Sequence, residues 1–227
     1  MSRRPRVWVP GGIYHVTVRG NNRDRMFLED VDYQQYLVEL RQHRDQWPFH
    51  VLAYALMPNH VHLVIEPSEE ASFSDVMRQQ GTRYAHYFNQ RYRHIGHVHQ
   101  GRFYSNWVNQ EPYLLEVTRY VHLNPVRARL CARPIEYRWS SYRQYVSQER
   151  DPLGLVECGK ILSLFGSTVE RRRLAYQTFV EELAEHEDRI RSWCRHLQRE
   201  KLIPPRRWLR ETDKDDNKVT VTLTPEK

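Results

Sequence analysis

The stretch Met57-Pro58-Asn59-His60-Val61-His62-Leu63-Val64-Ile65 places two histidines on either side of one valine within a run of strand-forming residues. Side chains alternate between the two faces of a strand, so His60 and His62 point the same way, roughly 6–7 Å apart. The aliphatic residues alternating with them point toward a core: Val61, Leu63 and Ile65. This pattern predicts either a metal-binding face or two histidines that merely decorate a surface, because a metal site needs further ligands.

The flanking segments extend this strand into a fold. In chain order we expect a strand at 13–19, a helix at 31–44 with Asp30 at its N-cap, strands at 49–57 and 60–65, a helix at 73–92 with Ser72 or Ser74 near its cap, and a strand at 101–108. Pro58-Asn59 makes the second and third strands an antiparallel hairpin. This order predicts an α+β class, a ferredoxin-like or RRM-like βαββαβ sandwich in which two helices cover one face of an antiparallel sheet.

The rest of the chain is expected to be helical. A helix is predicted at 111–124, where Pro125 discourages continuation, and the aromatic segment 137–142 is expected to pack back on the domain. The predicted organisation is a catalytic domain at 1–148, a helical C-terminal extension at 149–203 and a disordered tail at 204–227. Within the extension, 151–168 is expected to be a loosely ordered connection and 169–202 a charged helical stretch.

Composition indicates a soluble protein with a polyanionic partner. The chain has 227 residues, an apolar fraction of 40% and a net charge of +7, and its mean hydropathy is −0.80. Arginine greatly outnumbers lysine, which favours bidentate phosphate contacts. The cysteines suggest neither a disulfide framework nor a zinc site, and they fit a reducing cytosol: Cys131, Cys158 and Cys194. We expect no signal peptide and no membrane span.

A helical projection places Tyr120 and Asn124 one turn apart on the same side of the 111–124 helix. If that side meets the two histidines, the imidazoles and the Asn124 amide oxygen can hold a divalent cation, with Tyr120 beside it as a nucleophile. Other readings stay open, since Tyr120 suits an ordinary core position and Asn124 suits an N-cap before Pro125. The rival nucleophiles are Tyr84, Tyr104 and Tyr113.

Four separated motifs occur in an order that closely resembles the REP-associated tyrosine transposases, within the single-tyrosine HUH transposase superfamily. They are Met57–Val64, Gly96–Phe103, Arg119–Ala128 and Tyr137–Tyr142. The resemblance covers about residues 8–148. It implies that His60 and His62 are metal ligands, that Tyr120 is the nucleophile, and that Asn124 is the third ligand, where related insertion-sequence enzymes carry glutamine.

The resemblance also implies a reaction and a substrate. We expect cleavage of single-stranded DNA at hairpin-forming palindromic repeats, with Mg²⁺ or Mn²⁺, a 5′-phosphotyrosine intermediate and a free 3′-OH. The alternatives are a domesticated protein that binds hairpin DNA without cutting it, and an HUH replication or conjugation nickase. A monomer is expected rather than a homodimer, in the cytoplasm with the nucleoid.

Basic residues interleaved with aromatic ones indicate where DNA would be held, because cations follow phosphates and exposed rings stack on bases. The predicted DNA-binding residues are Arg3, Arg4, Arg6, Arg19, Arg83, Arg91, Arg93, Arg102 and Arg127. The aromatic residues among them include Tyr84, Tyr87, Phe88 and Tyr92, followed by His94, His97 and His99. For most of these aromatic residues, burial on the apolar side of the helix is the competing expectation.

Overall fold

A four-stranded antiparallel sheet forms the centre of the protein. The computed structural model describes residue 9 and residues 11–68, 73–149, 151–184 and 187–199. The strands are β1 (Ile13–Arg19), β2 (Phe49–Met57), β3 (His60–Pro67) and β4 (Tyr104–Val108), in the spatial order β2-β3-β1-β4. The predicted hairpin joins β2 to β3. Because β1 pairs with the other edge of β3, the strand that bears the two histidines lies inside the sheet. The predicted α+β class is confirmed.

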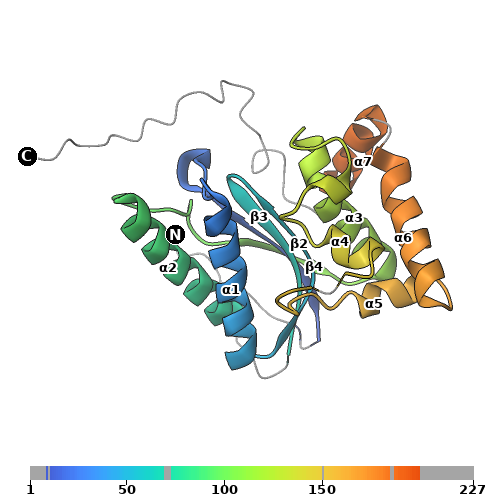
Figure 1. Ribbon diagram of the computed structural model, residues 1–227, viewed down its shortest axis with the longest axis horizontal. Coiled ribbons are helices and arrows are strands. Elements are labelled where there is room, and N and C mark those ends of the chain that lie inside the picture. Colours follow the sequence, from blue (N-terminus) through green and yellow to red (C-terminus); the bar gives the residue numbers. More distant parts are fainter. Residues whose placement is uncertain (1–8, 10, 69–72, 150, 185–186, 200–227) are drawn as a thin grey trace, which may run out of the picture.

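Helices cover both faces of this sheet (Figure 1). One face carries α1 (Asp30–Gln46) and α2 (Phe73–Tyr92), and the other carries α3 (Glu111–Arg127). Four more helices lie on the α3 side: α4 (Tyr142–Val146), α5 (Gly159–Leu162), α6 (Val169–Ala184) and α7 (Glu187–Arg199). Short 3-10 turns occur at Asn21–Arg23, Pro134–Glu136 and Ser163–Phe165. No described helix combines the length and the apolar character needed to span a bilayer.

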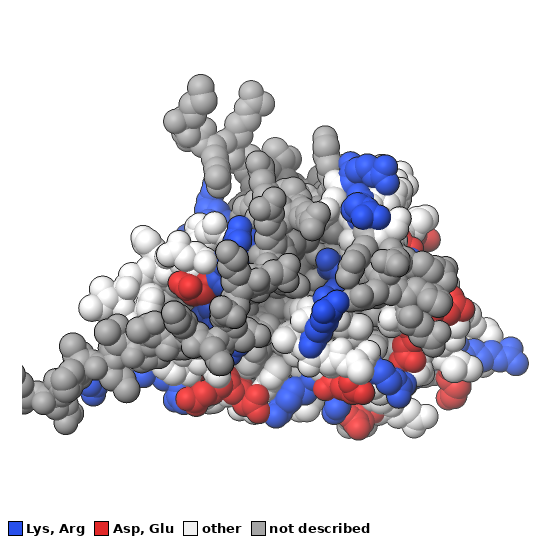
Figure 2. Space-filling view, turned by 90° about the horizontal axis from the view of Figure 1, so that it is seen from above, with Lys and Arg blue, Asp and Glu red and all other residues white. Residues whose placement is uncertain are grey.

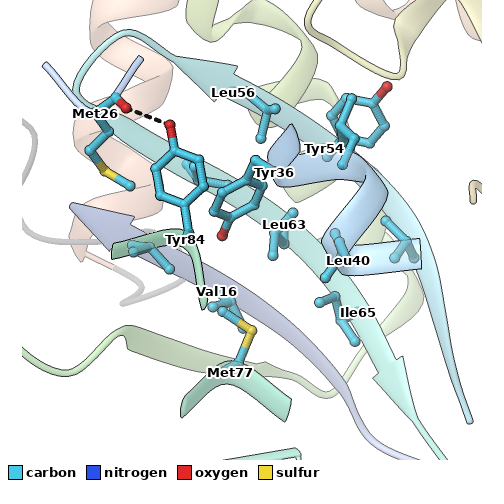
Figure 3. Packing of buried hydrophobic residues seen from close by; sticks show 14 of the residues in the cluster. Val16, Met26, Tyr36, Leu40, Tyr54, Leu56, Leu63, Ile65, Met77 and Tyr84 are labelled. Carbon is cyan, nitrogen blue, oxygen red and sulfur yellow. Dashed lines mark hydrogen bonds between the residues drawn. The ribbon is translucent and has the colours of Figure 1, made fainter. Parts of the chain in front are cut away.

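The core between the sheet and α1 and α2 is apolar and confirms the predicted strand register. Val61, Leu63 and Ile65 are completely buried there, and Figure 3 shows Leu63 and Ile65 packed beside Tyr36 and Leu40. Burial of such side chains contributes roughly 1.5–3 kcal/mol each. With these residues fixed inward on one side, His60 and His62 must lie on the other.

Several predicted boundaries were wrong. The N-cap of α1 is Glu29 rather than Asp30, because the Asp32 carboxylate accepts the backbone N–H groups of Leu28 and Glu29, at 2.8 and 2.9 Å. The fourth strand begins at Tyr104, after a glycine in the left-handed region at Gly101 (φ 125°). Ser74 lies inside the first turn of α2, and Ser72 falls outside the described residues.

The aromatic segment 137–142 packs back on the domain, as expected, whereas the connection that follows it is more ordered than predicted. Residues 139–141 bind the outer side of β2, with Leu56 N–H donating to Trp139 O and Ser141 N–H donating to Tyr54 O, at 2.9 and 3.0 Å. The connection 151–168 is structured, because the Asp151 carboxylate accepts three backbone N–H groups. The 169–202 stretch is helical as predicted, and it contains the two helices α6 and α7. The predicted tail, 204–227, lies outside the described residues.

Candidate active site

Strands β1 and β3 bring the two predicted histidines together on the α3 face of the sheet. His60 lies opposite Arg19 and His62 opposite Thr17 in the antiparallel register. The two imidazole centroids are 4.8 Å apart with perpendicular planes, and the side chains are buried, with exposures of 5% and 0%. The surface-decoration reading therefore does not describe these residues.

Each of the two imidazoles has one nitrogen engaged and one nitrogen without a partner. His60 Nδ1 lies 2.6 Å from Asn59 Oδ1, and His62 Nδ1 lies 3.0 Å from His15 Nε2 and 3.3 Å from Thr17 Oγ1. Both Nε2 atoms are buried and have no hydrogen-bond partner in the part of the chain that the structure describes. Buried polar nitrogens usually have a partner, so two unpaired ones on one face call for a ligand.

The electrostatic surroundings keep these imidazoles neutral. Burial, reinforced by the positive charges of Arg19 and then Arg127, lowers the pKa of His60 to about 3. Burial is also the main reason why the pKa of His62 falls well below its usual value. A neutral imidazole has a free lone pair, which is the form that binds a metal.

Sequence reasoning missed His15, which is completely buried on β1 beside His62. The two rings are stacked, with centroids 5.2 Å apart. The available signal was the alternation along β1, which puts His15, Thr17 and Arg19 on one face of the strand. Finding it required knowing that β1 pairs with β3 in this register, and the strand alone does not reveal that.

Helix α3 places Tyr120 against the imidazoles, which is the condition on which the predicted site depended. The Tyr120 ring centroid lies 5.4 Å from that of His62 and 5.8 Å from that of His15. The side chain is fully buried, and within the described ranges its hydroxyl makes no hydrogen bond of good geometry, although the Arg127 and Asn124 side chains approach it closely enough to lower its pKa. Burial raises the pKa of this hydroxyl, and the nearby Arg127 guanidinium, 5.1 Å from the ring centroid, opposes the rise. Tyr120 is thus both a member of the core and a neighbour of the histidines.

Asn124 lies one turn after Tyr120 and is engaged by its own helix. Its Nδ2 donates to the Tyr120 carbonyl at 2.7 Å, and its Oδ1 accepts from Arg127 Nη1 at 3.1 Å. The helix continues through Pro125 to Arg127, so the predicted end at Asn124 was wrong and Asn124 caps no following helix. A carbonyl oxygen has two lone pairs, so the bond from Arg127 leaves Oδ1 able to bind a cation.

The rotation of α3 about its axis is fixed by a buried polar contact behind Tyr120. His122 Nδ1 lies 2.7 Å from Tyr176 Oη on α6, and His122 Nε2 lies 2.8 Å from Ser141 Oγ beside β2. Turning α3 would break both contacts, and leaving such buried groups unpaired costs roughly 1–3 kcal/mol each. This clamp keeps Tyr120 directed at the imidazoles.

Helix α7 lies over the other side of Tyr120. The Trp193 ring centroid is 6.1 Å from that of Tyr120, and the Trp193 indole N–H donates to Glu116 on α3. Arg119 lies against the rings of both Phe179 and Trp193. The C-terminal extension therefore contributes directly to the burial of the candidate nucleophile.

The predicted DNA-binding arginines are distributed over several places. Arg19 and Arg127 lie at the histidines, whereas Arg83 and Arg91 lie on α2 on the other side of the sheet, where Arg91 pairs with Glu29 at 2.7 Å. Arg93 and Arg102 are exposed between α2 and β4. Three fall outside the described residues: Arg3, Arg4 and Arg6. In Figure 2, acidic side chains gather mainly along one edge of the view, while basic ones are spread across it.

Most of the aromatic residues of α2 are buried on the apolar side of the helix, which was the alternative to their stacking on bases. Tyr84 is fully buried and Phe88 nearly so. The hydroxyls of Tyr87 and Tyr92 both donate to the Asp32 carboxylate, at 2.8 to 2.9 Å. Tyr84 and Phe88 therefore pack in the core, and Tyr87 and Tyr92 bind the first turn of α1. These four rings are engaged within the protein and are not available to stack on bases.

The described residues contain no cluster of three or more His, Cys, Asp or Glu side chains arranged to hold a metal. The candidate set is two imidazoles and one amide oxygen, which is a sparse set for a protein metal site. Its remaining coordination positions would be left to water or to a phosphate. The two unpaired Nε2 atoms fit such a cation.

Comparisons with known proteins give one consistent result. The family model described as "Transposase IS200 like" matches residues 9–124. A Haemophilus influenzae protein whose name includes the words REP-associated tyrosine transposase is 25% identical over 163 residues, covering 67% of this chain and 92% of that protein. The REP-associated tyrosine transposase of Escherichia coli K12 is 22% identical over 154 residues, covering 67% of this chain and 90% of that protein.

A solved structure shares the fold. It is described as a REP-associated tyrosine transposase bound to a REP hairpin, and it matches with a TM-score of 0.57 and 20% identity. The match covers 69% of this chain and 92% of that one.

Proposed function

Because this chain belongs to the IS200-like transposase family, whose model spans residues 9–124, we propose that it cuts and rejoins single-stranded DNA through a covalent link to Tyr120. The proposal rests on one observation. Three buried polar atoms without partners among the described residues, His60 Nε2, His62 Nε2 and Tyr120 Oη, belong to neighbouring side chains from two distant elements.

His60, His62 and Asn124 would hold a divalent cation, Mg²⁺ or Mn²⁺. When bound, such a cation polarises a phosphate and neutralises charge that develops on it. In this role His62 Nε2 is unprotonated, so its Nδ1 carries the proton and donates to His15 Nε2. His15 and Thr17 thereby fix the orientation of the ligand ring.

Tyr120 is the nucleophile of the proposed reaction. A bond forms between its phenolic oxygen and the phosphorus, and the bond from phosphorus to the 3′ oxygen breaks. The phenol loses its proton and the departing 3′ oxygen gains one, which leaves a 5′-phosphotyrosine and a free 3′-OH. Arg127 lies close to the Tyr120 ring and opposes the rise in its pKa, so this guanidinium favours the charged phenolate.

The substrate is proposed to be DNA that contains a hairpin. The solved neighbour is described as bound to a REP hairpin, and the chain carries a net charge of +7. Arg19 and Arg127 would neutralise the phosphate at the histidines, while Arg93 and Arg102 would contact the DNA outside the site. The protein would act as a monomer in the cytoplasm, near the nucleoid.

The deciding experiment tests Tyr120→Phe for a denaturant-resistant protein–DNA adduct. The wild type is incubated with labelled hairpin DNA carrying single-stranded flanks and Mn²⁺, and the adduct is read on a denaturing gel. We expect Tyr120→Phe to lose the adduct and to keep hairpin binding, because only the attacking oxygen is removed.

Tyr36→Phe is the matched control, because the Tyr36 hydroxyl is also buried and lacks a partner among the described residues, but lies on the α1 side of the sheet. It should retain the full adduct. An adduct that persists in Tyr120→Phe would remove this residue from the mechanism.

One observation favours the alternative of a protein that binds hairpins without cutting them, namely the full burial of Tyr120 beside Trp193. The same gel separates the two functions. Hairpin binding by the wild type with no adduct in Mn²⁺ would support the non-cleaving function.

A further inference from the structure

The loop between α2 and β4 displays an isoleucine at its tip. Ile95 is 96% exposed, the highest value for any large apolar side chain in the described part of the chain. Single exposed apolar residues are common on protein surfaces. This one differs because the loop that carries it is held in a fixed shape.

Hydrogen bonds from the last turns of α2 fix the loop. The His94 backbone N–H donates to Asn89 O at 3.1 Å, and His94 Nδ1 lies 2.8 Å from Asn89 Oδ1. Asn89 Nδ2 also donates to Gly96 O at 3.2 Å. Arg93 adopts a left-handed conformation (φ 50°) that is uncommon for a residue with a side chain. Together with the bond from His94 N–H to Asn89 O, this conformation forms the left-handed C-cap with which helices commonly end, and it fixes the direction in which the loop leaves α2.

The surroundings of Ile95 are basic. The sequence contains no Asp or Glu between Asp75 and Glu111. Exposed cationic or titratable side chains flank the isoleucine: Arg93, His94, His97 and Arg102. An apolar tip flanked by arginines is complementary to nucleic acid, in which apolar base faces lie between phosphates.

The loop is tied to the end of the sheet that carries the candidate active site. Immediately after it, Val98 O accepts the Asn21 N–H and the Gln100 N–H donates to Arg19 O, both at 2.9 Å. Arg19 in turn lies opposite His60. DNA that reaches the histidines therefore lies near the end of the sheet to which this loop is anchored.

We propose that Ile95 packs against the terminal base pair of a DNA hairpin, at the junction between the stem and its single-stranded flank, while Arg93 contacts the adjoining phosphates. Isoleucine is branched at Cβ and stiff, so it presents a fixed apolar surface to a base pair. Only the end of a duplex exposes such a face, so the contact distinguishes a hairpin from an unstructured strand. The proposal rests on the proposed function in its choice of DNA as partner, but not on cleavage.

The test measures equilibrium binding by fluorescence anisotropy in EDTA, which removes the divalent cations that cleavage would require. The probes are a flanked DNA hairpin with 2-aminopurine at the junction and a scrambled oligonucleotide of the same composition. Ile95→Ala should weaken hairpin binding about 5–10-fold and abolish the change in 2-aminopurine emission that occurs when the wild type binds. Its affinity for the scrambled strand should change by less than about 2-fold. Arg93→Gln should weaken both probes alike and reduce the salt dependence, because it removes a phosphate contact.

Leu174→Ala is the matched control, since Leu174 on α6 is also a largely exposed aliphatic residue, at 65%. It should bind both probes as the wild type does. The proposal is overturned if Ile95→Ala keeps its hairpin affinity, or if it loses affinity for both probes equally. A change in oligomeric state with unchanged hairpin binding would also overturn it, by assigning the loop to self-association. Because binding is read without cleavage, a missing adduct would contradict the proposed reaction and leave this result intact.

Discussion

The two sides of the sheet bury the same kinds of side chain and use them differently. Within the described residues, the side of the sheet that carries α1 and α2 has buried polar atoms without partners on Tyr36, Glu39, His43, Gln80 and His99. The α3 side has them at the candidate site, on His60, His62 and Tyr120, and outside it, on Arg119, Gln144 and Arg173. A buried unpaired atom therefore does not by itself mark a site.

The origin and chemistry of the grouped side chains are what differ. On the α1 side, Tyr36, Glu39 and His43 follow one another on one face of a single helix, and the Gln80 side chain binds the Tyr36 carbonyl. On the α3 side, two imidazoles from β3 meet a phenol from α3. The ring centroids of His60 and His62 are 4.8 Å apart, and those of His62 and Tyr120 are 5.4 Å apart. Leaving such groups without partners costs stability, so their grouping indicates that a ligand satisfies them.

Adjacent residues on β3 give the largest expected contrast. Leu63 is fully buried in the apolar cluster, so Leu63→Ala should lower the free energy of unfolding by about 2–5 kcal/mol. His62→Asn keeps a polar atom near the Nδ1 position and removes Cε1 and the unpaired Nε2, a smaller volume than Leu63→Ala removes, so its loss should be roughly 1–2 kcal/mol. Urea unfolding in EDTA measures both.

A Mn²⁺ titration by calorimetry completes this contrast. Leu63→Ala should retain Mn²⁺ affinity where it folds, and His62→Asn should lose it. If His62→Asn is as destabilising as Leu63→Ala and still binds Mn²⁺, His62 belongs to the core rather than to a site.

A smaller effect is expected at His15, which acts through His62. His15→Ala removes the partner of His62 Nδ1 and should weaken Mn²⁺ affinity about 10–100-fold. His15→Gln restores a polar atom at the position of Nε2 and should recover much of that affinity. His43→Gln, a buried histidine on α1, is the control and should leave Mn²⁺ affinity unchanged. No recovery in His15→Gln, with equal loss of thermal stability in both His15 variants, would indicate a purely structural role.

The smallest effect concerns His99, a histidine that lies on the α2 side of the sheet, away from the candidate site. The His99 ring contacts Tyr84, and burial lowers the pKa of His99 to about 4. The folded state therefore holds this ring neutral while the unfolded chain takes up a proton below about pH 6.5. Its contribution to stability is present above pH 6.5 and is lost as the pH falls toward 4.

Urea unfolding at pH 7 and pH 4.5 measures this contribution. The wild type should lose on the order of 1–2 kcal/mol through His99, a figure discounted because the ring is partly open to solvent. His99→Gln should show a correspondingly shallower pH dependence, whereas His97→Gln, at an exposed position, should match the wild type. Identical pH profiles for His99→Gln and the wild type would contradict the assignment.

Several features followed directly from local sequence. The alternation in Met57–Ile65 predicted the register of β3, and the order of elements predicted the α+β sandwich, both of which are confirmed. The separated motifs also indicated the resemblance to REP-associated tyrosine transposases that the relatives bear out. The assignments of Tyr120, Asn124 and the histidines to catalysis stay predictions until they are tested.

Other features could not be read from local patterns. The end of α3 was misplaced because tertiary packing tolerates Pro125 within the helix. The 151–168 connection is ordered because one carboxylate, that of Asp151, gathers backbone N–H groups from the residues that follow it. Both depend on partners that composition and periodicity do not specify.

The sequence by itself determined which side chains share a face, because the periods of strands and helices are properties of the backbone. It thus paired His60 with His62 and Tyr120 with Asn124. Only the tertiary structure decided that these two faces meet, that His15 supports His62, and that α7 lies over Tyr120. Those contacts join residues far apart in the chain, and they depend on the packing of whole elements, which no local pattern encodes.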